Sequence, residues 1–265
     1  MSDMQPGPMD DQLPESQSEC PTDDWVIGDL PEWSRPHFTE LVDTLLSGDK
    51  PFPCTFAVAG ARKNTLRFAF VEALDDPSAW APLVDILVTY LKSYRELSRN
   101  TSLIVMFRTE DTGQTLEQYH RRFWSILQYL HEQDPEPWPA ELPADPDDPM
   151  WEFCFGGTPI FVVCNTPAHR ARLSRNGSNF LITFQPRWVF EHIGPDTNQG
   201  MAARKAIRRR LLAFDNMPPA RHLGDYGNPD NREYEQYFLP DTNDSEVPRC
   251  PFLHRESRTR PAAAD

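Results

Sequence analysis

The residues of this 265-residue sequence best suited to chemistry are a few cysteines and histidines, and the most distinctive lie in the segment RCPFLH (249–254). The proline after Cys250 biases it to extended backbone, and Arg249 favours the negative charge of a thiolate. A thiolate is a soft donor that suits haem iron, and Phe252 and Leu253 could cover a porphyrin face. The segment could equally supply a redox thiol, or an anchor that packs the tail onto the domain.

A second candidate for metal binding is a helix predicted over residues 114–133, which carries His120 and His131 on a stripe of aromatic and leucine side chains. The eleven residues between them span roughly 16 Å of helix, so the two histidines cannot bind the same metal ion. One of them could be the axial ligand of a haem lying against Phe123 and Trp124. The alternative, which this helix alone favours, is a core histidine hydrogen-bonded to a backbone carbonyl.

Five basic residues crowd into the segment RKAIRRR (204–210) of a helix predicted over 200–213. They are spread around the helix, so they favour a solvated face, or a partner for the acidic loop 134–149, over contact with a phosphate backbone. We therefore expect no nucleic-acid partner. The sequence holds no phosphate-binding loop, no G-x-S-x-G motif and no H-E-x-x-H motif, so hydrolase and zinc-protease functions lack support.

The elements that must position these side chains mix helical and strand-like patterns without a regular βαβ order. Helices are predicted over 34–48, 78–98, 114–133 and 200–213, and single strands over 102–107 and 179–184. Two hairpins are predicted as well, 53–59 with 65–72 and 151–155 with 160–164. This mixture predicts a single α+β domain, with a mixed or antiparallel sheet built from hairpins and packed by several helices.

The formal net charge of -14 is concentrated in two segments. Residues 1–24 hold seven acids and residues 134–149 hold six, in both cases without a Lys or Arg, and the other 27 acids nearly balance the 26 bases. Global acidity therefore says little about a partner. The composition predicts disordered tails at 1–24 and 255–265 around one domain at 25–254.

The start of the chain shows no signal-peptide pattern, and no apolar run approaches the ~20 residues of a membrane helix. The five cysteines are scattered and include no C-x-x-C pair, which argues against a disulfide framework. We therefore expect a reduced, cytoplasmic protein without membrane contact.

Several segments together resemble the YqcI/YcgG family over about residues 33–254. PFPCTFAVAGARKNTLRFAF (51–70) resembles the opening motif of that family, with Cys54 and Arg67 in place. FWSILQYLHEQDPEPWP resembles its helix-plus-loop signature, DPDDPMWEFCFGGTPIFVV its central hairpin, and CPF (250–252) its terminal motif.

Some members of the family resemble haem-dependent N-hydroxylases of guanidine-type substrates, as in the guanitoxin and D-cycloserine pathways. The resemblance implies a haem-dependent N-oxygenase of a small guanidine- or amine-containing metabolite, with an electron donor as a further partner. It also implies a pocket formed in part by the hairpin from Cys54 to Arg67, with Trp124 and Phe252 at the cofactor. Iron would do the oxygen chemistry, while the protein supplies ligand, orientation and polarity.

One position departs from the family pattern. After the central hairpin the family usually carries His-Pro, whereas this sequence has Thr166 there, with His169 nearby but out of register. His131 and Cys250 are therefore the alternative axial ligands, and His169 is a weaker candidate. Thiolate ligation favours O–O cleavage, whereas histidine ligation also suits storage or sensing. A non-enzymatic haem-binding or haem-sensing protein that uses the Cys-Pro motif, and a cofactor-free protein, are the alternatives.

A guanidinium substrate would need a carboxylate that matches its fork of donors. Glu72 and Glu152 flank the predicted hairpins and could supply one, but solvent-exposed positions suit both better. The sequence therefore assigns neither a clamp nor any catalytic residue.

Overall fold

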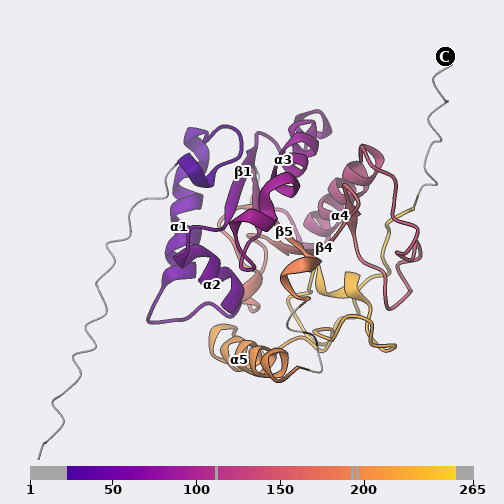
Figure 1. The fold of residues 1–265 in the computed structure, drawn as a ribbon. Coiled ribbons are helices and arrows are strands. Elements are labelled where there is room, and N and C mark those ends of the chain that lie inside the picture. Colours follow the sequence, from indigo (N-terminus) through magenta and orange to yellow (C-terminus); the bar gives the residue numbers. More distant parts are fainter. Residues whose placement is uncertain (1–22, 111–112, 192–193, 195–196, 255–265) are drawn as a thin grey trace, which may run out of the picture.

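The computed structural model describes residues 23–110, 113–191, 194 and 197–254, so nearly all of the predicted tail 1–24 and the whole of 255–265 lie outside it. The described chain is built on one five-stranded sheet (Figure 1). Its strands are β1 (Arg67–Val71), β2 (Leu103–Phe107), β3 (Cys154–Phe155), β4 (Thr158–Asn165) and β5 (Phe180–Pro186), in the order β1-β2-β5-β4-β3. Only β1 and β2 run parallel among these neighbours. The mixed sheet confirms the predicted α+β class.

Helices cover both faces of the sheet (Figure 1). The α-helices are α1 (Arg35–Leu46), α2 (Thr55–Arg62), α3 (Pro82–Leu97), α4 (Leu116–Glu132) and α5 (Asn198–Phe214). We call the side with α1 and α2 the α2 face, and the side with α3 and α4 the α4 face. None of the described helices combines the length and the apolar content that crossing a membrane requires.

Successive side chains of a strand point to opposite faces of the sheet, and this divides the core into two layers. On β2, Leu103, Val105 and Phe107 pack on the α4 face, whereas Ile104 and Met106 pack on the α2 face. All five side chains are buried, because helices cover both sides of this strand. The layer on the α4 face is the larger one, and the C-terminal segment contributes to it.

The first predicted hairpin, 53–72, is wrong. Residues 55–62 form helix α2, and β1 pairs with β2 instead. The Sγ atom of Cys54 accepts from the amide of Ala57 at 3.5 Å and caps the helix. The run contains three alanines, which favour a helix, and a short apolar run cannot be assigned by periodicity alone.

The second predicted hairpin is confirmed. β3 and β4 pair antiparallel through Gly156 and Gly157, both of which have positive φ. A tight hairpin turn needs this backbone conformation, which glycine adopts without strain.

Substitution of Gly60 tests how closely α2 packs against Asn100 and Leu66. A Cβ at this position would lie 2.6 Å from the carbonyl oxygen of Asn100 and 2.7 Å from Cδ2 of Leu66. Gly60→Ala should therefore lower the free energy of unfolding by about 2 kcal/mol, because overpacking outweighs the gain in helix propensity. Gly48→Ala is the matched control, since a Cβ there meets nothing within 4 Å. Equal urea midpoints for the two variants would contradict this close approach.

Candidate functional site

A cavity of about 280 Å³ lies between the sheet and helices α1, α2 and α5. Aliphatic and aromatic side chains make up most of its wall, among them Leu45, Phe56, Phe161, Ile207 and Leu211. Its polar side chains include Cys54, Asn165, Arg172, Arg175, Thr183 and Gln185. A largely apolar hollow with a few converging polar groups is typical of a small-molecule site, and this volume is near the lower end of the range. We call it the central cavity.

A second cavity of about 210 Å³ adjoins the central cavity. The two share four lining residues, Leu41, Phe52, Asn165 and Leu181, which form the partition between them. The second cavity is also lined by His37, whose Nδ1 lies 2.9 Å from the Ser178 hydroxyl. A change in the side chains of the partition would join the two spaces into one larger site.

Cys54 brings a sulfur atom to the wall of the central cavity. Burial raises the pKa of its thiol, while hydrogen bonds from the amides of Ala57 and Phe56 and the charges of Arg175 and Arg210 oppose this rise. The net effect keeps the sulfur protonated at neutral pH. The start of a helix, beside cationic groups, is nevertheless a place where a thiolate is stabilised once a ligand or metal replaces the proton.

Two buried arginines reach the central cavity from the loop between β4 and β5. Arg175 donates to the carbonyl oxygens of residues 236–237 at 2.9 and 3.4 Å. Arg172 donates to the Pro240 carbonyl at 2.8 Å and to Oδ1 of Asn243 at 2.8 Å. Burial lowers the pKa of Arg175 to about 10 and also lowers that of Arg172. All four of these acceptors are neutral, so they orient the guanidinium groups without neutralising them.

The weaker predicted ligand, His169, is buried and both of its ring nitrogens have partners. Nε2 lies 2.9 Å from the carbonyl oxygen of Leu239, and Nδ1 lies 2.9 Å from the hydroxyl of Thr166. Thr166, which stands where the family pattern has a histidine, thus helps to hold His169 in place. A metal ion could reach this imidazole only by displacing one of the two partners.

His131 lies on the α4 face within a cluster of rings. Its ring centroid is 4.9 Å from that of Phe252, 5.5 Å from that of Trp138 and 5.4 Å from that of His254. Gln128 and the backbone of Leu253 exchange two hydrogen bonds, of 2.9 and 3.1 Å, which fix the tail on α4. The side chains already present occupy the space beside the imidazole where a porphyrin would have to lie.

The segment RCPFLH packs through one of its two apolar residues. Phe252 is buried at 4% exposure, whereas Leu253 is 69% exposed. Cys250 packs against the same core, and burial raises the pKa of its thiol to about 12, so this cysteine is not a thiolate at neutral pH. Arg249 lowers this pKa, as predicted, but burial outweighs its charge, and its guanidinium also forms an ion pair with Asp147 at 2.8 Å.

The predicted cofactor-binding residues are divided between the two faces of the sheet. Cys54 lies on the α2 face, and His131, Cys250 and Phe252 lie together on the α4 face. A single haem cannot contact both groups, because the sheet separates them.

The other two predicted residues make contacts of their own. Trp124 is buried on the α4 face, where its Nε1 donates to Nε2 of His120 at 3.0 Å. Arg67 donates to the carbonyl oxygens of Asn64 and Leu66 and is not among the residues that line the central cavity. Of the two residues predicted to bound the pocket, Cys54 lines the central cavity and Arg67 does not.

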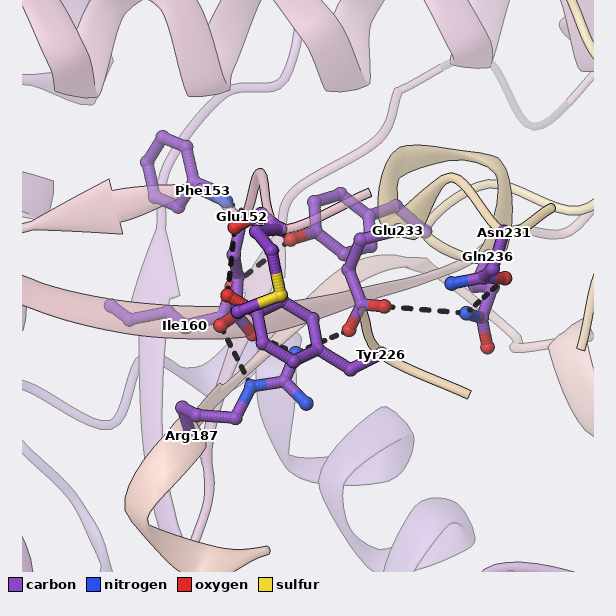
Figure 2. A network of polar contacts seen from close by, with 10 residues as sticks. Glu152, Phe153, Ile160, Arg187, Tyr226, Asn231, Glu233 and Gln236 are labelled. Carbon is purple, nitrogen blue, oxygen red and sulfur yellow. Dashed lines mark hydrogen bonds and ion pairs between the residues drawn. The ribbon is translucent and has the colours of Figure 1, made fainter. Parts of the chain in front are cut away.

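Figure 2 shows a buried network that the sequence interpretation missed. Arg187 donates from Nε to Glu152 at 2.7 Å and also pairs with Glu233, and the Tyr226 ring lies over its guanidinium at 3.9 Å. Glu152 is 0% exposed, so the expected surface position is wrong. Burial raises the pKa of Glu152 to about 7, against the charge of Arg187. The signal for this network was a charged residue inside the apolar run WEFCF.

The basic helix α5 is mostly solvated. Lys205, Arg208 and Arg209 are exposed, and Arg204 pairs with Asp225 at 3.3 Å rather than with the acidic loop 134–149. Within the described part of the chain, no group of three or more His, Cys, Asp or Glu side chains could hold a metal ion.

His169 should make stability fall in acid. Burial lowers its pKa to about 4 from 6.5, so its contribution is fully present above pH 6.5 and is lost as the pH falls towards 4, by about 3 kcal/mol at most. His169→Asn should remove this dependence. Urea unfolding of both proteins from pH 7 to pH 4 measures it as the difference between two curves. That difference matters because Glu152, with its raised pKa, titrates in the opposite sense over an overlapping range. Parallel curves would contradict the prediction.

Comparison with known proteins finds relatives that are similar in sequence along most of the chain. The chain is 41% identical to "Uncharacterized protein YcgG" of Bacillus subtilis (strain 168) over 229 residues, 85% of this chain and 90% of the relative. It is 38% identical to "Uncharacterized protein YqcI" of the same organism over 239 residues, 89% of this chain and 94% of the relative.

A third relative has a name that states an activity. The chain is 35% identical over 256 residues, 92% of this chain and 94% of the relative, to "Putative N(omega)-hydroxy-L-arginine synthase DcsA" of Streptomyces lavendulae. No solved structure matches the chain. The model of the YqcI/YcgG family matches residues 38–253, which include every lining residue of the central cavity, all but His37 of the second cavity, and the RCPFL part of the tail. On this match and these identities, the chain belongs to the YqcI/YcgG family.

Proposed function

We propose that this protein is an N-oxygenase that uses haem to hydroxylate a nitrogen of a small guanidine- or amine-containing metabolite. The observation that carries the proposal is the similarity, along 92% of the chain, to a protein named for the synthesis of N(omega)-hydroxy-L-arginine. The central cavity supports it, because it offers a largely apolar space of metabolite size with a few polar groups.

The central cavity suits a haem in the chemistry of its side chains. Cys54 would supply a soft sulfur donor to the iron, Arg172 and Arg175 would hold carboxylate groups, and the apolar wall suits a porphyrin ring. In volume the cavity matches a metabolite, so a haem would also need the adjoining space behind Leu41 and Phe52.

We therefore propose Cys54, rather than His131 or Cys250, as the residue that would bind the iron. The cysteine faces a cavity, whereas Phe252 and Trp138 fill the space beside His131. The amides at the start of α2 and the charge of Arg175 would stabilise negative charge on the Cys54 sulfur. This assignment is testable residue by residue.

The protein's own side chains would prepare the substrate. The apolar wall excludes water, and Asn165, Thr183 and Gln185 place hydrogen-bonding groups at β4 and β5 around the space. When bound, haem supplies the activation of oxygen. The overall reaction places one oxygen atom of O₂ in an N–H bond and reduces the other to water, with two electrons and two protons from an external donor.

The ligand assignment predicts the behaviour of three variants. Protein purified from haem-supplemented cells should show a Soret band, and so should Cys250→Ser and His131→Gln. Cys54→Ser should lose the band or shift it, because the variant replaces sulfur by a harder oxygen donor. Spectra recorded before and after dithionite and carbon monoxide distinguish thiolate from histidine ligation. An unchanged Cys54→Ser spectrum with loss of the band in His131→Gln or in Cys250→Ser would move the ligand to the α4 face. A colourless wild-type protein that takes up no haem would sink the haem proposal.

The activity itself predicts a product. With reductant and oxygen, the loaded protein should convert L-arginine or a related guanidine or amine into a species heavier by one oxygen atom, detected by mass spectrometry. Omitting oxygen or reductant should abolish the product. A protein that binds haem but consumes no reductant with any such compound would favour a haem-sensing role instead.

A further inference from the structure

We infer that the central cavity recognises its ligand through a carboxylate, with Arg175 as the anchor and Arg172 beside it. This deepens the proposed function by naming the charged group that the same site binds, and it rests on that function for the choice of ligands tested. The observations that carry it are the burial of the two arginines, their neutral partners and the charge of the cavity wall.

Both guanidinium groups are deeply buried. Arg175 is 7% exposed and Arg172 is 1% exposed. A guanidinium carries five N–H donors, and the hydrogen bonds of Arg175 to residues 236–237 use two of them. A buried charge costs much less when an opposite charge meets it, and neutral carbonyl oxygens do not provide one.

The two carboxylates whose charges act on the arginines form their hydrogen bonds elsewhere. Asp215 accepts from the amide and the hydroxyl of Ser174, at 2.6 and 2.9 Å. Asp241 accepts from the backbone amides of residues 170–172, at 2.7 to 3.0 Å. Asp215 stabilises the charges of both arginines from a distance and Asp241 stabilises that of Arg172, but the salt bridges of the described residues include none to Arg172 or Arg175.

The wall of the central cavity carries no compensating acid. None of the described residues that line it is Asp or Glu, and Arg210 adds positive charge near Cys54 from α5. The cavity therefore attracts a carboxylate, which can accept two parallel hydrogen bonds from a guanidinium fork. An amino acid would enter with its carboxylate towards the β4–β5 loop and its side chain along the apolar wall.

Cys54 reports the charge of the cavity directly. Iodoacetate and iodoacetamide both alkylate a thiolate with loss of iodide, and they differ in that only iodoacetate carries a carboxylate. We expect the ratio of their rates at Cys54, followed by peptide mass mapping at alkaline pH, to exceed the ratio for glutathione by about tenfold. A ratio at or below that of glutathione would overturn the inference, and so would a Cys54 that reacts with neither reagent.

Variants identify the source of the preference. Arg172→Gln and Arg175→Gln should each lower the rate ratio towards that of glutathione, and Arg175→Lys should keep part of it. Lys205→Gln is the matched control, because it removes one positive charge from the exposed side of α5. An unchanged ratio in Arg172→Gln and Arg175→Gln would overturn the assignment. If Arg175→Gln fails to fold, the rate ratios of the wild-type protein and of Arg172→Gln still test the inference.

The carboxylate could belong to an amino acid or to a porphyrin propionate, and protection of Cys54 from iodoacetamide separates the two. L-Arginine is compared with agmatine, which lacks the carboxylate, and protoporphyrin IX with its dimethyl ester. In at least one pair, the compound with the carboxylate should protect Cys54 at a concentration about tenfold lower than the compound without it. That pair identifies which kind of molecule supplies the carboxylate. Equal protection within both pairs, or protection by none of the four, would overturn the inference. Alkylation needs neither haem nor turnover, so its outcome is separate from that of the oxygenase test.

Discussion

The pairing of Arg187 with two buried glutamates is the interaction on which the rest of the structure depends. Glu152 precedes the β3–β4 hairpin, Arg187 follows β5, and Glu233 opens the short 3-10 helix η6 (Glu233–Gln236) (Figure 2). One guanidinium therefore joins three segments that are distant in the sequence. Loss of Arg187 would leave two carboxylates buried without a counter-charge, a change that costs about 3–5 kcal/mol in buried ion pairs of this kind.

The chain beyond η6 links this ion pair to the central cavity. Tyr237 is fully buried, and its hydroxyl accepts from the Phe153 amide and donates to the Ile160 carbonyl. Its own carbonyl and those of Gln236, Leu239 and Pro240 accept hydrogen bonds from Arg175, Arg172 and His169. The C-terminal segment is therefore the base that orients the arginines of the site. A pocket built this way needs nearly the whole chain, which agrees with family similarity over residues 38–253.

Sequence patterns predicted the long elements and missed the arrangement between them. The segments 78–98 and 114–133 carry apolar residues at helical spacing, and that spacing alone was enough to predict their helices. Segment 53–59 was too short for its period to separate helix from strand, so α2 was assigned as a strand. Cys54 was predicted at the cofactor and does face a cavity, but strand order decides which side of the sheet it occupies. The buried arginines were missed because basic residues in a loop resemble solvated ones.

The place of Phe252 has a consequence for how the chain is made. Its ring packs on Trp151 and Phe153 as well as on His131, so it closes the large apolar layer of the α4 face from near the end of the described chain. During synthesis, α3 and α4 therefore emerge long before the residue that covers them. The growing polypeptide must keep an apolar helix pair in contact with water, or with chaperones, until translation reaches this position. Completion of this fold thus waits until translation has passed Phe252, and slow elongation before that position would lengthen the interval in which the protein can aggregate.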